Sequence, residues 1–334
     1  MTEPFHIHKM EEKRREEGRK NMELSLMLIE QIMVMVIMAL AGFLAAKAGV
    51  ITGKESRTIS QLVIYVAVPC ALTDAFQTEL DGDKLEGLAV AFLASCVLHA
   101  LYLAMTWLLA RTGHPLTPGE QGSVIYSNSV NLVMPIIAGT LGTEYIIYTC
   151  PYMVAQSALM WTHGQALMGG EKQLNLKKIV TNPCICSIFL GMVLFFLQIR
   201  LPGALGSAVS SLGSCIGPLS MVVIGILLAE TDLKQALTSV RMYWVTGLRL
   251  LVFPLVSAAV LWGVERCWGH GEGEAVMLVT LLCAIGPSAT TITQLAQMFR
   301  SPESRYVSSV NAVTTLLCVV TMPIMILLFQ MLPA

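Results

Sequence analysis

Two short polar stretches interrupt hydrophobic spans of this chain, at matching places in its two halves. Residues 127–135 read SNSVNLVMP, and residues 286–291 read GPSATT. Hydrocarbon offers the backbone no hydrogen-bond partners, so a broken helix at membrane depth is tolerated only where protein or a water-filled cavity satisfies it. Paired breaks of this kind are typical of the substrate site of a secondary transporter built from an inverted repeat. The sequence therefore predicts binding and transport.

The prolines in these stretches explain how a ligand could be held there. Proline lacks an N–H and frees the carbonyl four residues earlier, which makes the Asn131 oxygen (from Pro135) and the Cys283 oxygen (from Pro287) available to a ligand or ion. The half-helices that follow point positive N-terminal ends at the same place, which suits an anion. We therefore expect Pro135, Gly286 and Pro287 to form a crossover of two broken helices.

The composition places the chain in a membrane. Of its 334 residues, 55% are hydrophobic and 13% are charged, with a mean hydropathy of +0.68, whereas soluble domains carry about a quarter charged residues. We predict an all-α integral membrane protein with ten spans of about 20 residues each. The spans are expected at 26–48, 57–77, 87–110, 119–142, 145–168, 183–200, 207–229, 242–264, 274–298 and 307–331. They leave no room for a soluble catalytic domain.

Five spans in each half predict a 5+5 inverted repeat, because an odd number of helices inserts the second copy upside down. The placement of prolines supports this repeat. Pro69 in the second span corresponds to Pro218 in the seventh, and Pro135 in the fourth span corresponds to Pro287 in the ninth. The expected organisation is an N-terminal tail at 1–25, a first five-helix repeat at 26–168, a cytoplasmic loop at 169–181 and a second five-helix repeat at 182–334.

Lysine and arginine are concentrated in the loops that follow odd-numbered spans, which predicts that both termini face outward and that loop 169–181 faces the cytoplasm. The basic tail before Met22 contradicts this orientation. Its run EEKRREEGRK can be encoded almost entirely by purines, as a translated ribosome-binding site would be. We therefore hypothesise that the native chain begins at Met22.

Residues spread over both halves resemble a known family. They are residues 65–69 (YVAVP), Ser127 and Asn128 with Pro135, Asn182 with Pro183, residues 218–221 (PLSM) with Gly225, Arg249 with Pro254, Gly286 with Pro287, and residues 321–323 (TMP). In their order and spacing they resemble the auxin efflux carrier family of permeases, which includes plant auxin efflux carriers and bacterial malate or malonate transporters.

The resemblance implies a ten-helix inverted repeat in which spans 4 and 9 unwind and cross. It also implies an elevator carrier, with spans 1, 2, 6 and 7 as a scaffold and spans 3–5 and 8–10 moving with the substrate. Val130 and Val133 stand where bacterial relatives usually carry glycines. The shape of the pocket and the substrate are therefore not carried over from those relatives.

Two asparagines of the first break are candidate substrate ligands. Asn128 and Asn131 are three residues apart and share a helical face. Amides donate and accept hydrogen bonds, which suits carboxylate and hydroxyl groups, although such amides also hold membrane helices together. Ser127 and Ser129 are weaker candidates for the same role.

Hydroxyl groups follow the second break. Ser288, Thr290 and Thr291 stand at the start of a half-helix, where hydroxyls and free N–H groups can hold an anion together. Gln294 lies three residues beyond Thr291 and is a further candidate. Back-bonding of the hydroxyls to helix carbonyls is the alternative.

Charged and titratable residues within the spans complete the candidate site. Arg249, about a third of the way into its span, suits a carboxylate through its planar guanidinium, unless it snorkels to the cytoplasmic interface. His99 and His163 can accept protons during transport. Asp74 is the nearest to an embedded carboxylate. Whether protons or sodium ions drive transport stays open.

We therefore predict a secondary active transporter of the elevator type in the plasma membrane, which moves a small organic anion such as malate or an auxin-like acid. A non-transporting sensor or receptor for such an anion is the alternative. A membrane-embedded enzyme is disfavoured, because no Gly-x-Ser-x-Gly or His-Glu-x-x-His motif is present. No cofactor, metal or nucleic acid is expected, the nine cysteines being mostly packing residues, and a homodimer is left open.

Overall fold

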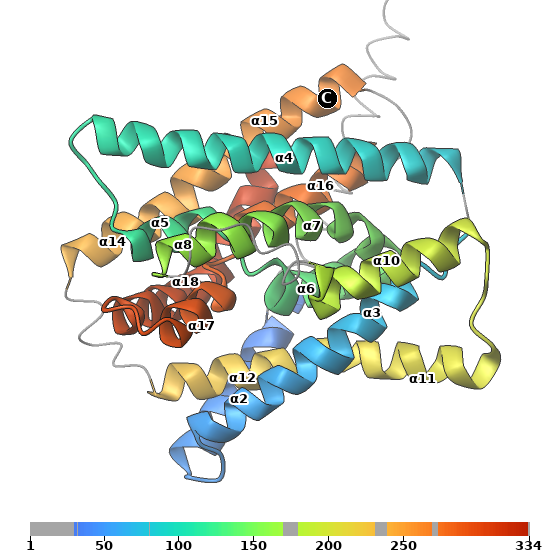
Figure 1. Cartoon of the computed structure of the whole chain (residues 1–334), viewed down its shortest axis with the longest axis horizontal. Helices are drawn as coiled ribbons and strands as arrows, with labels where there is room; N and C mark the ends of the chain where they lie inside the picture. Colours follow the sequence, from blue (N-terminus) through green and yellow to red (C-terminus); the bar gives the residue numbers. More distant parts are fainter. Residues whose placement is uncertain are drawn as a thin grey trace, which may run out of the picture.

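The computed structural model describes residues 30–31, 33–79, 81–169, 180–230, 239–268 and 273–332, and every regular element in these ranges is helical (Figure 1). Several sequence-based predictions lie outside the described residues. They concern the tail 1–25 with Met22, the charges of loop 169–181, and the side chain of Asn131.

The first half begins with a helix at Met33–Lys47. It continues with α2 (Gly53–Leu62), the π-helix η1 (Val63–Ala67), α3 (Val68–Ala75), α4 (Gly82–Arg111), α5 (Pro118–Ile125), the π-helix η2 (Ser129–Val133), α6 (Met134–Thr140), the 3₁₀-helix η3 (Thr143–Tyr148), α7 (Thr149–Leu159), the π-helix η4 (Met160–Gly164) and α8 (Gln165–Leu167).

The second half of the described chain is also helical. It contains α10 (Pro183–Phe196), α11 (Gly203–Ser214), α12 (Ile216–Glu230), α14 (Val240–Gly247), the π-helix η5 (Leu248–Val252), α15 (Phe253–Trp268), α16 (Gly273–Ile285), α17 (Thr290–Met298) and α18 (Ser304–Gln330).

Within the described residues, five continuous helical stretches are long and apolar enough to cross a membrane: Glu55–Ala75, Gly82–Arg111, Gly203–Ala229, Val240–Trp268 and Ser304–Gln330. Shorter apolar helices are Met33–Lys47, Pro183–Phe196 and Gly273–Ile285. Large hydrophobic side chains also face outward, among them Phe189, Leu93 and Val320, which are 70%, 64% and 61% exposed. An apolar exterior is expected where the surrounding solvent is lipid, so the fold is that of a multi-pass membrane protein.

We divide the helices into two groups by their contacts, which can be followed in Figure 1. In the lower part, α3 packs against α10 and α11, while α12 packs against α2. In the upper part, α4 packs against α7 and α16, and α15 packs against α16. We call the first set, together with the helix Met33–Lys47, group A. The remaining elements, α4 to α8 and α14 to α18 with their π- and 3₁₀-helices, are group B.

Small residues allow two helices of group A to cross closely. A Cβ added to Gly225 of α12 would lie 1.8 Å from the Ala39 carbonyl oxygen, and one added to Gly42 would lie 2.2 Å from the Val222 carbonyl oxygen. Lipid provides little hydrophobic force between helices, so such close backbone packing is a main source of their association.

Three of the π-helices have a common cause in the sequence. Each ends two residues before a proline: η1 before Pro69, η2 before Pro135 and η5 before Pro254. The next N–H after each π-helix bonds the carbonyl five residues back. Proline removes a donor and its ring clashes with the carbonyl four residues earlier, so the preceding turn widens. Pro135 therefore widens its helix, and α6 continues through it.

Candidate functional site at the crossing of two broken helices

The first break lies at residues 126–128, upstream of the position expected from Pro135. Pro118 at the first turn of α5 and its N-cap Thr117, which accepts a hydrogen bond from the Glu120 N–H, start that helix. The helix ends where Tyr126 turns to an extended backbone at φ −97° and ψ 128°. The helix resumes at Ser129 as η2. The sequence thus indicated the interrupted span, but the proline is not the point of interruption.

The second break lies at residues 286–289, between α16 and α17, and contains Gly286 and Pro287. The two breaks pair with each other. The Asn128 N–H donates to the Pro287 carbonyl at 2.8 Å, and the Ala289 N–H donates to the Tyr126 carbonyl at 2.9 Å. Ser127 and Ser288 form the resulting antiparallel bridge. Backbone groups that helices would otherwise satisfy are thus satisfied across the crossing, as a membrane interior requires.

An amide from α7 holds the first break. Gln156 Oε1 accepts from the Ser127 N–H at 2.9 Å and from its hydroxyl at 3.0 Å. Its Nε2 donates to the Ser127 carbonyl at 3.0 Å and to the Ser129 hydroxyl at 3.2 Å. The hydroxyls of Ser127 and Ser129 are therefore engaged in fixing the loop.

An amide from α18 holds the second break in a comparable way. Asn311 Nδ2 donates to the Ser288 carbonyl at 2.6 Å, and Thr314 Oγ1 accepts from the Ser288 N–H at 3.2 Å. The sequence analysis did not single out Gln156 or Asn311. The signal was present, because each is a polar amide within an apolar span, as Asn128 is.

Arg249 binds both broken helices. Its side chain is fully buried, which excludes snorkelling. Its Nε donates to the Gly286 carbonyl at 2.9 Å, its Nη1 to the Val124 carbonyl at 2.9 Å, and its Nη2 to the carbonyls of Ala284 (2.8 Å) and Gly286. Four of its five N–H groups are thus bound to backbone carbonyls.

Two polar groups at the paired breaks have no hydrogen-bond partner among the described residues: Asn128 Nδ2 and Ser288 Oγ. Asn128 is 3% exposed and Ser288 is fully buried. A buried polar group without a partner costs about 1–3 kcal/mol. Asn128 is the N-cap of η2, and Ser288 precedes α17, so both lie at positive helix ends. These groups can donate to an acceptor that enters the crossing.

The remaining candidates of the second break lie on α17. Thr290 and Thr291, in its first turn, are half-buried, whereas Gln294 is exposed. The structure thus brings Ser288 and Asn128 together, and it places Gln294 about one turn farther along the helix.

The two histidines lie near the first break, and each is next to a tyrosine. His163 Nδ1 is 3.0 Å from the hydroxyl of Tyr126. The His99 ring centroid is 4.9 Å from that of Tyr152, whose hydroxyl accepts from Ser127 at 3.3 Å. Asp74 belongs to α3 in group A, whereas His99 and His163 belong to α4 and η4 in group B.

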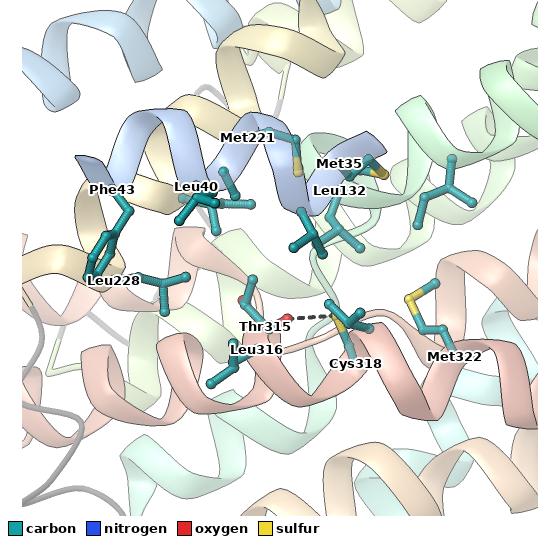
Figure 2. A pocket seen from close by; sticks show the side chains of 15 residues that line it. Met35, Leu40, Phe43, Leu132, Met221, Leu228, Thr315, Leu316, Cys318 and Met322 are labelled. Carbon is teal, nitrogen blue, oxygen red and sulfur yellow. Dashed lines mark hydrogen bonds between the residues drawn. The ribbon is translucent and has the colours of Figure 1, made fainter. Parts of the chain in front are cut away.

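An apolar cavity of about 260 Å³ lies between the two groups, beside the crossing. Figure 2 shows Met35, Leu40 and Phe43 of the first helix facing residues of α18 across it. The cavity is lined by Met35, Val36, Ala39, Leu40, Phe43, Met221, Ile224 and Leu228 of group A, and by Leu132, Ile136, Thr315, Leu316, Cys318, Val319 and Met322 of group B.

A single hydroxyl among these side chains, that of Thr315, is buried with no hydrogen-bond partner in the described part. The next residue along α18 toward the N-terminus, Thr314, bonds Ser288 of the second break, and Leu132 belongs to η2, which follows the first break. Both breaks are therefore linked to elements that line the cavity, the first through η2 and the second through α18. No group of three or more His, Cys, Asp or Glu side chains that could hold a metal ion occurs among the described residues.

Long apolar helices, a lipid-compatible exterior and two broken helices that cross define a multi-pass membrane protein with an internal polar crossing. Residues 27–326 match the model of the family described as membrane transport protein. The chain belongs to this family, which confirms the resemblance to the auxin efflux carriers at family level. A comparison with curated proteins found no match. The family is one of transporters rather than enzymes.

Proposed function

We propose that this protein is a secondary active transporter of the elevator type, which carries a small organic anion across the plasma membrane. In this proposal group A is the scaffold and group B is the moving unit, and the chain is a 5+5 inverted repeat of ten spans. The similar contacts of the two breaks support the repeat, because an amide from the helix that follows each broken span, Gln156 of α7 or Asn311 of α18, binds a serine of that break.

The observation that carries the proposal is that two buried donors at the crossing have no hydrogen-bond partner among the described residues. A substrate carboxylate that accepts from Asn128 Nδ2 or from Ser288 Oγ would satisfy that group, and a hydrogen bond to a charged group is worth about 1.5–3 kcal/mol. The positive ends of η2 and α17 favour the same negative charge. The roles predicted for Asn131, Thr290 and Thr291 remain part of the proposal.

The lining of the cavity supports a choice between a monocarboxylate and a dicarboxylate as the substrate. Its lining is apolar apart from the Thr315 hydroxyl, so it suits the body of a monocarboxylate with a hydrocarbon or aromatic portion. A second carboxylate, as in malate, would be desolvated there without a partner, at a cost of several kcal/mol. We therefore favour an auxin-like monocarboxylate over a dicarboxylate.

The test is uptake into proteoliposomes that contain only this protein. Labelled indole-3-acetate should accumulate, unlabelled aryl or alkyl monocarboxylates should compete, and malate should compete at least tenfold less well. A matched preparation of empty liposomes gives the background from passive entry of the neutral acid. Saturable binding without accumulation would favour a sensor, and preference for malate would overturn the choice of substrate.

A further inference from the structure

The guanidinium of Arg249 lies where three backbone carbonyls converge. Val124 belongs to the last turn of α5, Ala284 to the last turn of α16, and Gly286 opens the second break. All four hydrogen bonds from Arg249 go to these three carbonyl oxygens, at 2.8 to 2.9 Å for three of them. Among the described residues, no carboxylate is one of its hydrogen-bond partners.

Such a set of carbonyls has a definite electrostatic character. The C-terminal end of a helix carries about half a negative charge, concentrated on its unpaired carbonyls. Two such ends meet here, and the side chain that faces them is fully buried. Carbonyls of unwound segments and half-helix C-termini commonly coordinate the driving cation in secondary transporters, and rings of carbonyls replace the hydration shell of a monovalent ion. Without a positive charge at this place, the crossing would hold convergent, unsatisfied acceptors.

We propose that Arg249 is a tethered cation that permanently fills a monovalent-cation site at the crossing. The crossing then assembles without an inorganic cation. If the proposed function is correct, substrate binding at the crossing is also independent of sodium and potassium ions. This second statement rests on the proposed function, whereas the first does not.

The geometry favours this role over that of a substrate ligand. The planar fork of arginine presents N–H groups in fixed directions, and Nε, Nη1 and Nη2 of Arg249 all point at carbonyls. Lysine would supply the charge as a single point on a different stem, so it cannot reproduce these contacts. The fixed charge also offsets the two C-terminal ends, so that the positive N-terminal ends of η2 and α17 can attract an anion to Asn128.

The wild-type protein provides the first arm of the test, with no substrate present. The midpoint temperature of unfolding in detergent is measured in sodium, potassium and choline chloride at equal ionic strength. We expect equal midpoints, because the site is already filled. A saturable rise in sodium or potassium relative to choline would overturn the proposal, since a ligand stabilises the folded state by mass action.

The second arm uses Arg249→Ala, which should empty the site. This variant should unfold at a lower temperature, and low millimolar guanidinium, sodium or potassium should restore part of the loss in a saturable manner, while choline should not. Arg111→Ala is the control, because Arg111 is exposed and its guanidinium lies 4.2 Å from the centroid of the Trp107 ring, and small cations should not rescue it.

A folded Arg249→Ala protein that no small cation stabilises would overturn the proposal. If Arg249→Ala cannot be recovered folded, the ion comparison on the wild type decides alone. Neither arm requires transport, so a failed uptake assay and a failed cation assay point to different errors.

Discussion

At the scale of single residues, the crossing separates side chains that fix its shape from side chains with unused bonding capacity. Backbone carbonyls of the two breaks accept hydrogen bonds from Gln156, Asn311 and Arg249. Asn128 Nδ2 and Ser288 Oγ have no partner in the described part. We therefore expect substitutions in the first set to lower stability, and substitutions in the second to lower substrate affinity.

Substitutions of Asn128 test the expectation that groups with unused bonding capacity contribute to substrate affinity. Asn128→Ala should leave the protein folded but weaken transport at least tenfold, which corresponds to about 1.4 kcal/mol. Asn128→Asp should be worse, because it sets a negative charge against an anion in a site of low dielectric. Uptake at several substrate concentrations measures both, with Gln297→Ala, an exposed amide on α17, as the control. Normal transport by both variants would exclude Asn128 as a ligand, and tolerance of Asp would indicate a cationic substrate.

A substitution of Gln156 tests the expectation that side chains bound to the breaks contribute to stability. Gln156→Ala leaves the Ser127 N–H and carbonyl without their bonds from α7, and each unsatisfied buried group costs about 1–3 kcal/mol. The unfolding midpoint in detergent should fall clearly. Gln121→Ala is the control, because that amide bonds only the Leu116 carbonyl at the start of α5 and should have a smaller effect. Equal shifts for the two variants would argue against the amide clamp.

At the scale of elements, prolines and glycines decide how helices are shaped and how closely they approach. Pro69, Pro135 and Pro254 each follow a π-helix by two residues. The π-helix before Pro254 contains Arg249, so the extra residue in that turn helps set where the guanidinium points. Gly42 and Gly225 let the first helix lie directly against α12.

The glycine contact gives a prediction about packing in group A. Gly225→Ala places a Cβ 1.8 Å from the Ala39 carbonyl oxygen, so the first helix must move away from α12 and the protein should be destabilised. Gly263→Ala in α15 meets nothing within 4 Å and should be neutral or stabilising by about 0.5–1 kcal/mol, because alanine is the better helix former. Thermal unfolding of the two purified variants makes the comparison. A harmless Gly225→Ala would contradict the close crossing.

At the scale of the whole molecule, two groups of helices meet around an apolar cavity, and the crossing lies within group B beside it. Relative motion of the groups would change the lining of the cavity from both sides. This arrangement is what makes transport, rather than binding alone, the proposed function.

Filling the cavity tests that proposal. Val319→Trp, from a residue that lines the cavity, should reduce uptake at least tenfold while leaving the unfolding midpoint unchanged or higher, because the added ring occupies existing space. Val320→Trp is the matched control, since Val320 is the next residue of α18 and is 61% exposed. Uptake and thermal unfolding are measured on both variants. Full transport by Val319→Trp would place the substrate path elsewhere.

The sequence by itself determined the membrane class, the family resemblance and the presence of two interrupted spans. These follow from local properties: hydrophobicity averaged over about 20 residues, and the missing N–H of proline. It also selected Asn128, Ser288, Gly286 and Pro287, all of which lie in the paired breaks. It did not determine the position of the first break, because a proline can widen a helix into a π-turn as well as end it.

Only the tertiary structure decided what the buried polar groups contact. The sequence left open whether Arg249 lies inside the protein or at the membrane interface, and its carbonyl partners Val124 and Gly286 lie far from it in the chain. Gln156 and Asn311 became recognisable as clamps only when the serines they bind were located. Hydrogen-bond partners are set by the arrangement of whole helices, and that arrangement depends on packing between distant residues, which no local pattern encodes.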